Sequence, residues 1–275
     1  MTLNSKWKMY LRFIFNVSIG FLIVCPILYG LSLSFMKEAD IFAYPPKLFP
    51  RAVTLENYAK VIQTIPIFRF LFNSVAVSVF VMLGQIVTSS LAAYAFVFFD
   101  FKYKKILFVA MLATMMIPGE ATIISNYLTM SSLKLLDTYA GLILPFLASA
   151  MGIFLIRQFY LTVPKELKEA AVLDGCSDVL FFGRILLPLS VPVLSALSIY
   201  TLIGTWNQYM WPMLITNTPA KRTVQIGISM LQFSDGRLIG IISAGCMMIL
   251  VPSILLFIAG QQRMVQSITA GSVKG

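Results

Sequence analysis

Six stretches of this chain are apolar over roughly 20 residues or more, and they constrain its fold more than any other feature. They run over residues 12–34, 71–98, 106–130, 139–160, 190–213 and 239–260. A helix of about 20 such residues crosses the hydrocarbon core of a bilayer. Inside lipid every backbone N–H and C=O must be paired within the segment, which favours helices. We therefore predict an all-α integral membrane protein with about six transmembrane helices.

Charged residues are scarce, and histidine is absent. Of 275 residues, 12% are charged, against roughly 25% in a soluble domain, so lipid must solvate much of the chain. The three cysteines, Cys25, Cys176 and Cys246, are scattered. This composition argues against zinc sites, disulfide frameworks and histidine-based catalysis. We therefore expect neither a metal site nor enzymatic activity.

The net charge of +10 indicates membrane orientation rather than nucleic-acid binding, because the basic residues form no stripe with interleaved aromatics. An even number of spans places both termini on one side. With both termini cytoplasmic, twelve of the 21 basic residues lie inside, and five of the other nine lie in one long loop, which counts less. A cleavable signal peptide at the first stretch is the alternative. That stretch is longer than the about 7–15 residues of a signal core, and no clear A-x-A site follows it.

The loops suggest two regions. Residues 1–70 contain the N-terminal tail, the first span and a proline-rich outer loop at 35–70, where we expect short irregular pieces and small helices. Residues 71–275 form a core domain with the other five spans. A second outer loop follows at 214–238.

The cytoplasmic connection at 161–189 is predicted to be structured. Pro164 suits a first helical turn, Glu166 and Glu169 favour the N-terminal half of a helix, and Gly175 suits the position just past its end. The predicted helix has about three turns. One face, at i, i+3, i+4 and i+7 spacing, carries Leu167, Ala170, Ala171 and Asp174. From these residues alone, a membrane-surface hairpin without a partner is an equal alternative.

Farther along, Ser177 is expected to cap a second short helix that runs through Arg184, before Leu187-Pro188 begins the next span. One pattern in this connection runs Glu169-Ala170-Ala171, three residues, Gly175, nine residues and then Ile185-x-Leu187-Pro188. It resembles the EAA motif of ABC importer permeases. In that family the loop is a coupling helix that docks on a cytoplasmic ATPase subunit. The resemblance assigns this coupling role to Glu169, Ala170, Ala171, Asp174, Gly175, Leu187 and Pro188.

The resemblance covers most of the chain and is closest to the carbohydrate-uptake class. Three segments resemble signatures of that class: Met116-Ile117-Pro118, Leu136 to Leu142 with Leu144-Pro145, and Trp206 to Pro212. It implies a type I importer fold and a bacterial inner-membrane location. It also implies a second homologous permease, two ATPase subunits and an external solute-binding protein. The chain has no G-x-x-x-x-G-K-[ST] loop, so ATP and Mg belong to the ATPase subunits and the chain itself holds no cofactor.

The resemblance implies that the chain forms half of a path for a sugar or sugar derivative, such as an oligosaccharide, glycerol-3-phosphate or a glycerophosphodiester. A carboxylate in an apolar span suggests function, and aromatic and amide side chains suit sugar recognition. Candidates are Glu120, Asn126, Trp206, Asn207 and Tyr209. The alternatives are that Glu120 simply reaches water and that the aromatic residues belong to an interfacial belt.

The outer loop at 214–238 carries Lys221, Arg222 and Arg237. By the resemblance, these residues contact the solute-binding protein; a solvated connector is the alternative. A secondary transporter is the rival function. Such proteins usually have internal repeats and charged residues near the midplane, whereas this chain shows no convincing repeat and has Glu120 as its one candidate midplane charge. An integral-membrane enzyme is disfavoured by the absence of histidine and of a tight acidic cluster.

Overall fold

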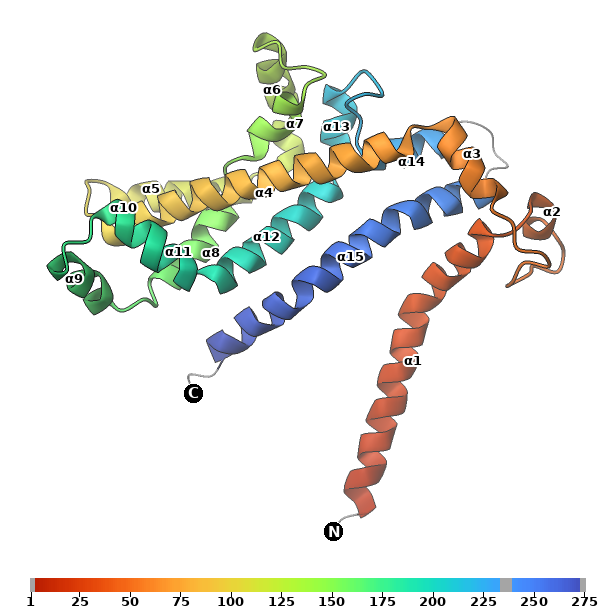
Figure 1. The fold of residues 1–275 in the computed structure, drawn as a ribbon, viewed down its shortest axis with the longest axis horizontal. Helices are drawn as coiled ribbons and strands as arrows, with labels where there is room; N and C mark the ends of the chain where they lie inside the picture. Colours follow the sequence, from red (N-terminus) through yellow and green to blue (C-terminus); the bar gives the residue numbers. More distant parts are fainter. Residues whose placement is uncertain (1–2, 233–238, 273–275) are drawn as a thin grey trace. The chain divides into compact units, whose positions relative to one another are not determined.

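The structure is a computed structural model that describes residues 3–232 and 239–272, and its regular elements there are helical (Figure 1). Their bounds are α1 Leu3–Ser34, α2 Glu38–Ile41, α3 Glu56–Thr64, α4 Ile67–Phe98, α5 Lys104–Ala113, α6 Gly119–Ser132, α7 Tyr139–Ile143, α8 Ala150–Tyr160, α9 Lys165–Leu173, α10 Asp178–Phe181, α11 Leu187–Leu189, α12 Val191–Trp206, α13 Met210–Ile215, α14 Val224–Gln232 and α15 Ile239–Ser272. Short 3-10 turns at Thr114–Met116 and Leu144–Phe146 and a π-helical turn at Phe182–Leu186 complete the described elements. The predicted all-α fold is confirmed.

The predicted apolar stretches are largely helical, but several of them are broken. Trp7–Ser34 and Ile67–Phe98 are each long and apolar enough to cross a membrane. Three bent pairs follow: Lys104–Met116 with Gly119–Ser132, Tyr139–Phe146 with Ala150–Tyr160, and Asp178–Leu189 with Val191–Trp206, bent by 101°, 46° and 75°. Among the described residues there are thus two unbroken candidate spans, or up to five if each bent pair counts as one. The first half of α15, Ile239–Leu255, is a further apolar segment, shorter than the two unbroken candidate spans.

Proline explains two departures from continuous spans. The stretch expected at 106–130 bends at Pro118, where Ile117 is extended, with φ −87° and ψ 116°. A proline disfavours the helical conformation of the residue before it. The stretch expected at 190–213 is also not one helix, because α12 ends at Trp206 and α13 begins at Met210. Pro212 has no N–H for the Gln208 carbonyl, so a continuous helix would leave that acceptor unpaired.

One of two compact units comprises Met1–Ile67 and Gly227–Pro252. The buried Asn57 of α3 donates hydrogen bonds to the carbonyls of Ser34 and Met36, with N–O distances of 3.0 and 2.8 Å. In the loop that follows α1, a hydrogen bond from Lys47 holds the pKa of Asp40 below its ordinary value. The helices α2 and α3 confirm the small helices predicted for this loop.

The other unit comprises Phe68–Ile226 and Ser253–Gly275, and α4 contacts a core at each of its ends. Near the start of α4, a cluster combines Val77, Val81, Met130, Leu142, Trp211 and Ile215. Near its end, a second cluster combines Ala93, Tyr94, Ile156, Tyr160, Val163, Ala171, Phe181, Leu186 and Leu197. Figure 1 shows α9 and α10 at this second end of α4, and α13 toward the first.

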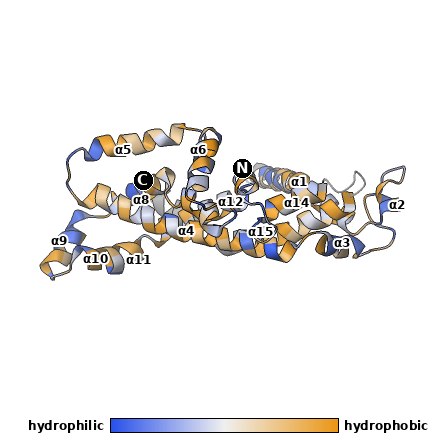
Figure 2. Ribbon diagram, turned by 90° about the horizontal axis from the view of Figure 1, so that it is seen from above, coloured by the Kyte–Doolittle hydropathy of each residue, from blue (hydrophilic) through white to orange (hydrophobic). Residues whose placement is uncertain are grey.

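Small residues let helices of this unit approach closely. A Cβ added to Gly152 of α8 would lie 2.6 Å from Ser89 Oγ of α4 and 3.2 Å from the Leu197 side chain of α12. Such contacts are typical of helix packing in membranes, where small side chains bring backbones together. In Figure 2, α4 is mainly hydrophobic, whereas hydrophilic residues gather in α9. The unit therefore presents a polar element at one end of an apolar helix bundle.

Candidate functional site

The predicted helix of the 161–189 connection is α9. It begins at Lys165, with Pro164 at the N-cap position rather than inside the first turn. Past its end, Gly175 has φ +77°, a left-handed conformation that glycine adopts at little cost. The Gly175 N–H donates to Val172 O over 3.0 Å, and the Cys176 N–H donates to Ala171 O over 2.9 Å. This pair of bonds is a Schellman motif, as the glycine indicates.

The face predicted for α9 does not behave as one surface. Ala171 is buried, 7% exposed, and packs in the cluster at the end of α4. Glu169, Ala170 and Asp174 are exposed, and so is Gly175. Leu167, at i−4 from Ala171 on the same face, is also exposed, at 37%, so the stripe that α9 buries is narrower than the predicted face. The structure thus separates one buried alanine from an exposed set.

The second half of the connection has the predicted cap, and its helix runs through Arg184 as predicted but continues to Leu189. The Ser177 hydroxyl accepts a hydrogen bond from the Leu180 N–H over 3.3 Å, at the start of α10. The helix then continues as a π-helical turn, which includes Arg184, and as α11. Leu187 is half-buried and Pro188 is exposed. The 75° bend comes between Leu189 and Val191, so Leu187-Pro188 precedes the long part of the span.

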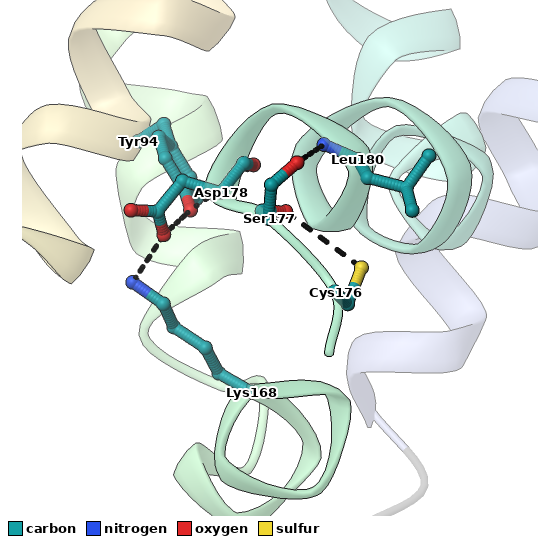
Figure 3. Close-up of polar contacts among 6 residues, drawn as sticks. All are labelled: Tyr94, Lys168, Cys176, Ser177, Asp178 and Leu180. Atoms are coloured by element: carbon teal, nitrogen blue, oxygen red, sulfur yellow. Dashed lines mark hydrogen bonds and ion pairs between the residues drawn. The ribbon is translucent and has the colours of Figure 1, made fainter. Parts of the chain in front are cut away.

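The same connection also carries exposed apolar side chains, which the sequence prediction did not include. Leu173 of α9 is 88% exposed, Val179 of α10 is 81% exposed, and Val172 is 57% exposed. Figure 3 shows this loop from close by, with the Ser177 cap of α10 and Lys168 of α9. Exposed apolar patches with a polar rim mark interaction sites. We name Glu169, Ala170, Val172, Leu173, Asp174 and Val179 the α9 surface.

A second site brings together most of the predicted path residues. A cavity of about 420 Å3 is lined by Glu120 and Asn126 of α6 and by Asn207 and Tyr209 after α12. These two segments lie far apart in the sequence. Thr122 and Gln208 also line it and were not predicted. Trp206 does not line it; it is 6% exposed and buried in the fold.

The bend at Pro118 places Glu120 in the first turn of α6. A carboxylate there lies near the partial positive charge of the helix N-terminus. Asn126 lines the same cavity from the second turn that follows. Trp211 also lines it, but its indole N–H donates to Gly141 O over 3.2 Å and its ring contacts Phe146 edge-on, which gives it a packing role.

A neighbouring cavity extends this site along α12. It has about 480 Å3 and shares the lining residues Phe146, Gly204 and Gln208 with the first cavity. Its wall includes Gln85, whose side chain accepts from the Thr201 hydroxyl over 2.7 Å and donates to Phe146 O over 2.8 Å. The two cavities share part of their walls, and we name them together the furrow.

The loop after α13 is fixed by Asp137. Its carboxylate accepts hydrogen bonds from the Thr218 hydroxyl over 2.7 Å and from the N–H groups of Asn217 and Thr218 over 3.0 and 3.1 Å. Burial acts to raise the pKa of Asp137, but these hydrogen bonds outweigh it and hold the pKa below its ordinary value. The sequence marked this residue only as part of a motif.

The predicted contact residues of that loop pack on the chain itself. The Lys221 ammonium lies 3.9 Å from the ring centroid of Tyr139. The Arg222 carbonyl accepts from Asn73 over 2.8 Å. Arg237 lies outside the described residues. Lys221 and Arg222 therefore belong to one ordered loop at the start of α4.

Comparison with known proteins bears on both sites. The profile of the family described as binding-protein-dependent transport system inner membrane component matches residues 85–268. The chain is 39% identical over 222 residues to the sn-glycerol-3-phosphate transport system permease protein UgpE of Rhizobium meliloti (strain 1021), a match that covers 78% of this chain and 79% of that protein. It is 32% identical over 273 residues to the arabinooligosaccharides transport system permease protein AraQ of Halalkalibacterium halodurans, with coverage of 98% and 97%.

A solved structure has the same fold. With a TM-score of 0.85 and 20% identity, the chain matches a chain from the crystal structure of a bacterial ABC transporter involved in the import of the acidic polysaccharide alginate, covering 95% of this chain and 98% of that one. At this identity the match concerns the fold alone. The 161–189 connection and the furrow both overlap the part matched by the family profile.

Proposed function

The chain belongs to the family of binding-protein-dependent transport system inner membrane components, and on that premise we propose that its α9 surface receives an ATPase subunit while its furrow forms half of a substrate path. It is a multi-pass inner-membrane permease subunit of an ABC importer and not an enzyme. The complex we propose contains a second homologous permease, two ATPase subunits that hold ATP and Mg, and an external solute-binding protein. ATP binding and hydrolysis then turn the path outward and inward.

The exposure of Leu173 is the observation that carries the proposal for α9. A leucine that is 88% exposed beside an exposed valine stays in water unless a partner covers it, and burying one such side chain is worth about 1.5–3 kcal/mol. Glu169, Ala170, Asp174 and Gly175 surround it and would contact the same partner. Leu187 and Pro188 would support the loop from the bundle side.

The test is copurification of the ATPase subunit with the permease. We expect Leu173→Glu to reduce the recovered ATPase by at least about tenfold, because loss of a central interface contact costs roughly 2 kcal/mol or more. Leu133→Glu is the matched control, since Leu133 is also exposed, at 57%, but lies past the end of α6. Equal recovery with both variants would contradict the assignment of the α9 surface.

For the furrow we propose a sugar or sugar derivative, and its chemistry favours a neutral oligosaccharide over a phosphate ester. Among the described residues that line the two cavities, Glu120 is the one that carries a charge. A phosphate 4 Å from this carboxylate would be repelled by about 1–4 kcal/mol, depending on the local dielectric. Asn126, Asn207 and Tyr209 offer hydrogen-bonding groups to hydroxyls instead; Trp206 would act only by supporting this wall.

Proteoliposomes with the complete importer and its binding protein test this substrate class. We expect uptake of an arabino-oligosaccharide and none of glycerol-3-phosphate. Glu120→Ala should lower the sugar uptake by about tenfold, since a hydrogen bond to a charged group is worth roughly 1.5–3 kcal/mol. Ser125→Ala, on α6 but outside the cavity lining, should leave uptake unchanged. Uptake of glycerol-3-phosphate would overturn the choice of substrate class.

We also propose that the ordered loop after α13 faces the binding protein, with Lys221 and Arg222, and Arg237 beyond it, as contact residues. The contacts of Asp137 and Tyr139 with this loop support the proposal, because a preordered loop loses less entropy on binding. In this orientation both termini are cytoplasmic, and residues 71–275 form the core permease domain. A cysteine-accessibility map that places residue 102 outside would contradict this orientation.

A further inference from the structure

Lys168 of α9 is held by two other helices. It is 21% exposed, and its ammonium Nζ lies 2.9 Å from Asp178 Oδ1 of α10 (Figure 3). The same oxygen accepts a hydrogen bond from the Tyr94 hydroxyl of α4, also over 2.9 Å. One carboxylate oxygen therefore joins α4, α9 and α10. We name Lys168, Asp178 and Tyr94 the Lys168 anchor.

Aromatic rings in and just past the end of α4 lie close to the same ammonium. The Lys168 Nζ lies 5.5, 5.4 and 5.3 Å from the ring centroids of Tyr94, Phe98 and Phe99. At this distance a ring attracts a cation to its face. Phe98 also packs edge-on against Phe181 of α10, with centroids 5.7 Å apart. The end of α4 thus contacts both helices of the connection.

The rest of α9 has few attachments to the bundle. Among the described side chains of this helix, Ala171 is the buried one. A Cβ added to Gly175 would meet nothing within 4 Å, so this position just past the helix has room around it. A displacement of α9 alone would pull the ammonium from the carboxylate and from three rings, and would leave Asp178 with Tyr94 as its partner. α9 and the end of α4 should therefore move together.

We propose that Lys168 is a positioning residue that transmits a displacement of α9 to α4 through Asp178 and Tyr94. The proposal rests on the proposed function of the α9 surface as the contact with the ATPase subunit. It assigns a role to a residue outside that surface. A single exposed ion pair is worth little, but the anchor combines an ion pair, a charge-assisted hydrogen bond and cation–π contacts in a partly enclosed position.

The experiment measures whether α9 and α4 move as one body in the complete importer. Cys25, Cys176 and Cys246 are replaced by alanine, and spin labels are placed at Phe80 of α4 and Glu166 of α9. The label-to-label distance is compared between the nucleotide-free state and the state trapped with ATP and vanadate. With Lys168 present, we expect the two distances to agree within about 2 Å, the size of small helix shifts.

In Lys168→Met we expect the distance to shift by more than about 2 Å between the states and its distribution to broaden. Lys168→Arg should restore the wild-type behaviour, since arginine also pairs with carboxylates and stacks on rings. Tyr94→Phe, which keeps the ring but removes the hydroxyl, should give an intermediate result. Lys165→Met is the matched control on the same helix and should behave as the wild type. If Lys168→Met reduces the yield, Asp178→Asn gives the same test.

Copurification of the ATPase subunit and its rate of ATP hydrolysis are measured on the same samples. A Lys168→Met complex that keeps both, with an unchanged label distance, overturns the role of Lys168 and leaves the proposed function intact. A wild-type permease that recruits no ATPase subunit contradicts the proposed function itself. Retained assembly with an uncoupled α9, rescued by arginine, supports the anchor, because a merely structural lysine would alter stability and not the state-dependent distance.

Discussion

Replacement of Gly175 separates backbone strain from steric crowding on the α9 surface. Its φ of +77° costs a residue with a Cβ about 1–2 kcal/mol, whereas a Cβ there would meet nothing within 4 Å in this chain. Gly175→Ala should therefore weaken the Schellman bonds without any clash. A cost of 1–2 kcal/mol corresponds to a change of roughly 5–30-fold in the ratio of loops with the Schellman bonds formed to loops with these bonds broken.

Amide hydrogen exchange of peptides covering residues 171–177 measures this ratio. We expect exchange in Gly175→Ala to be about 5–30-fold faster than in the wild type. Gly175→Asn should exchange at a rate nearer the wild type, because asparagine tolerates the left-handed conformation. Gly183→Ala is the control: an added Cβ there also meets nothing within 4 Å, and its φ is not in the left-handed range.

Uptake by the reconstituted importer then shows which effect matters for transport. If strain dominates, uptake falls more in Gly175→Ala than in Gly175→Asn; a larger fall in Gly175→Asn indicates crowding against the partner. Unchanged exchange in Gly175→Ala would refute the strain argument. Normal uptake in both variants would refute the proposed role of this glycine in coupling.

Three further results are expected. Gly152→Val should lower the free energy of unfolding of the solubilised protein by about 1–3 kcal/mol, because the larger side chain would overpack against Ser89 and Leu197. Gly20→Val should leave it unchanged, because nothing lies within 4 Å of a Cβ at Gly20. Trp211→Phe should cost roughly 1–3 kcal/mol because the buried Gly141 carbonyl loses its donor, against no change for Trp7→Phe at an exposed position; equal melting temperatures would contradict this. The hydrogen bonds to the ionised Asp137 carboxylate lower its pKa and stabilise the loop at pH values above the ordinary pKa of 3.8. This stabilisation is lost as the pH falls through the lower pKa of the folded state. Limited proteolysis within residues 214–223 should therefore accelerate below about pH 3.8 in the wild type, and Asp137→Asn should show the faster cleavage already at neutral pH.

The sequence by itself determined the class of fold and the helix of the 161–189 connection. Apolar stretches of this length leave helices in lipid as the solution for the backbone. The helix of the 161–189 connection was also predictable, because proline, glutamate and glycine act within one or two turns of where they stand. Gly175 and Ser177 occupy the terminal positions that their local chemistry favours.

Only the tertiary structure decided which residues meet. Glu120 and Asn207 line one cavity because the chain bends at Pro118 and stops α12 at Trp206, and hydropathy averages over such breaks. Hydropathy also did not predict the exposure of Leu173, because a leucine has the same hydropathy whether its side chain is buried in the core or exposed. The Lys168 anchor depends on contacts between α4 and α10, more than 80 residues apart. No local pattern encodes such a contact, because the energy of an ion pair depends on where the folded chain places its two partners.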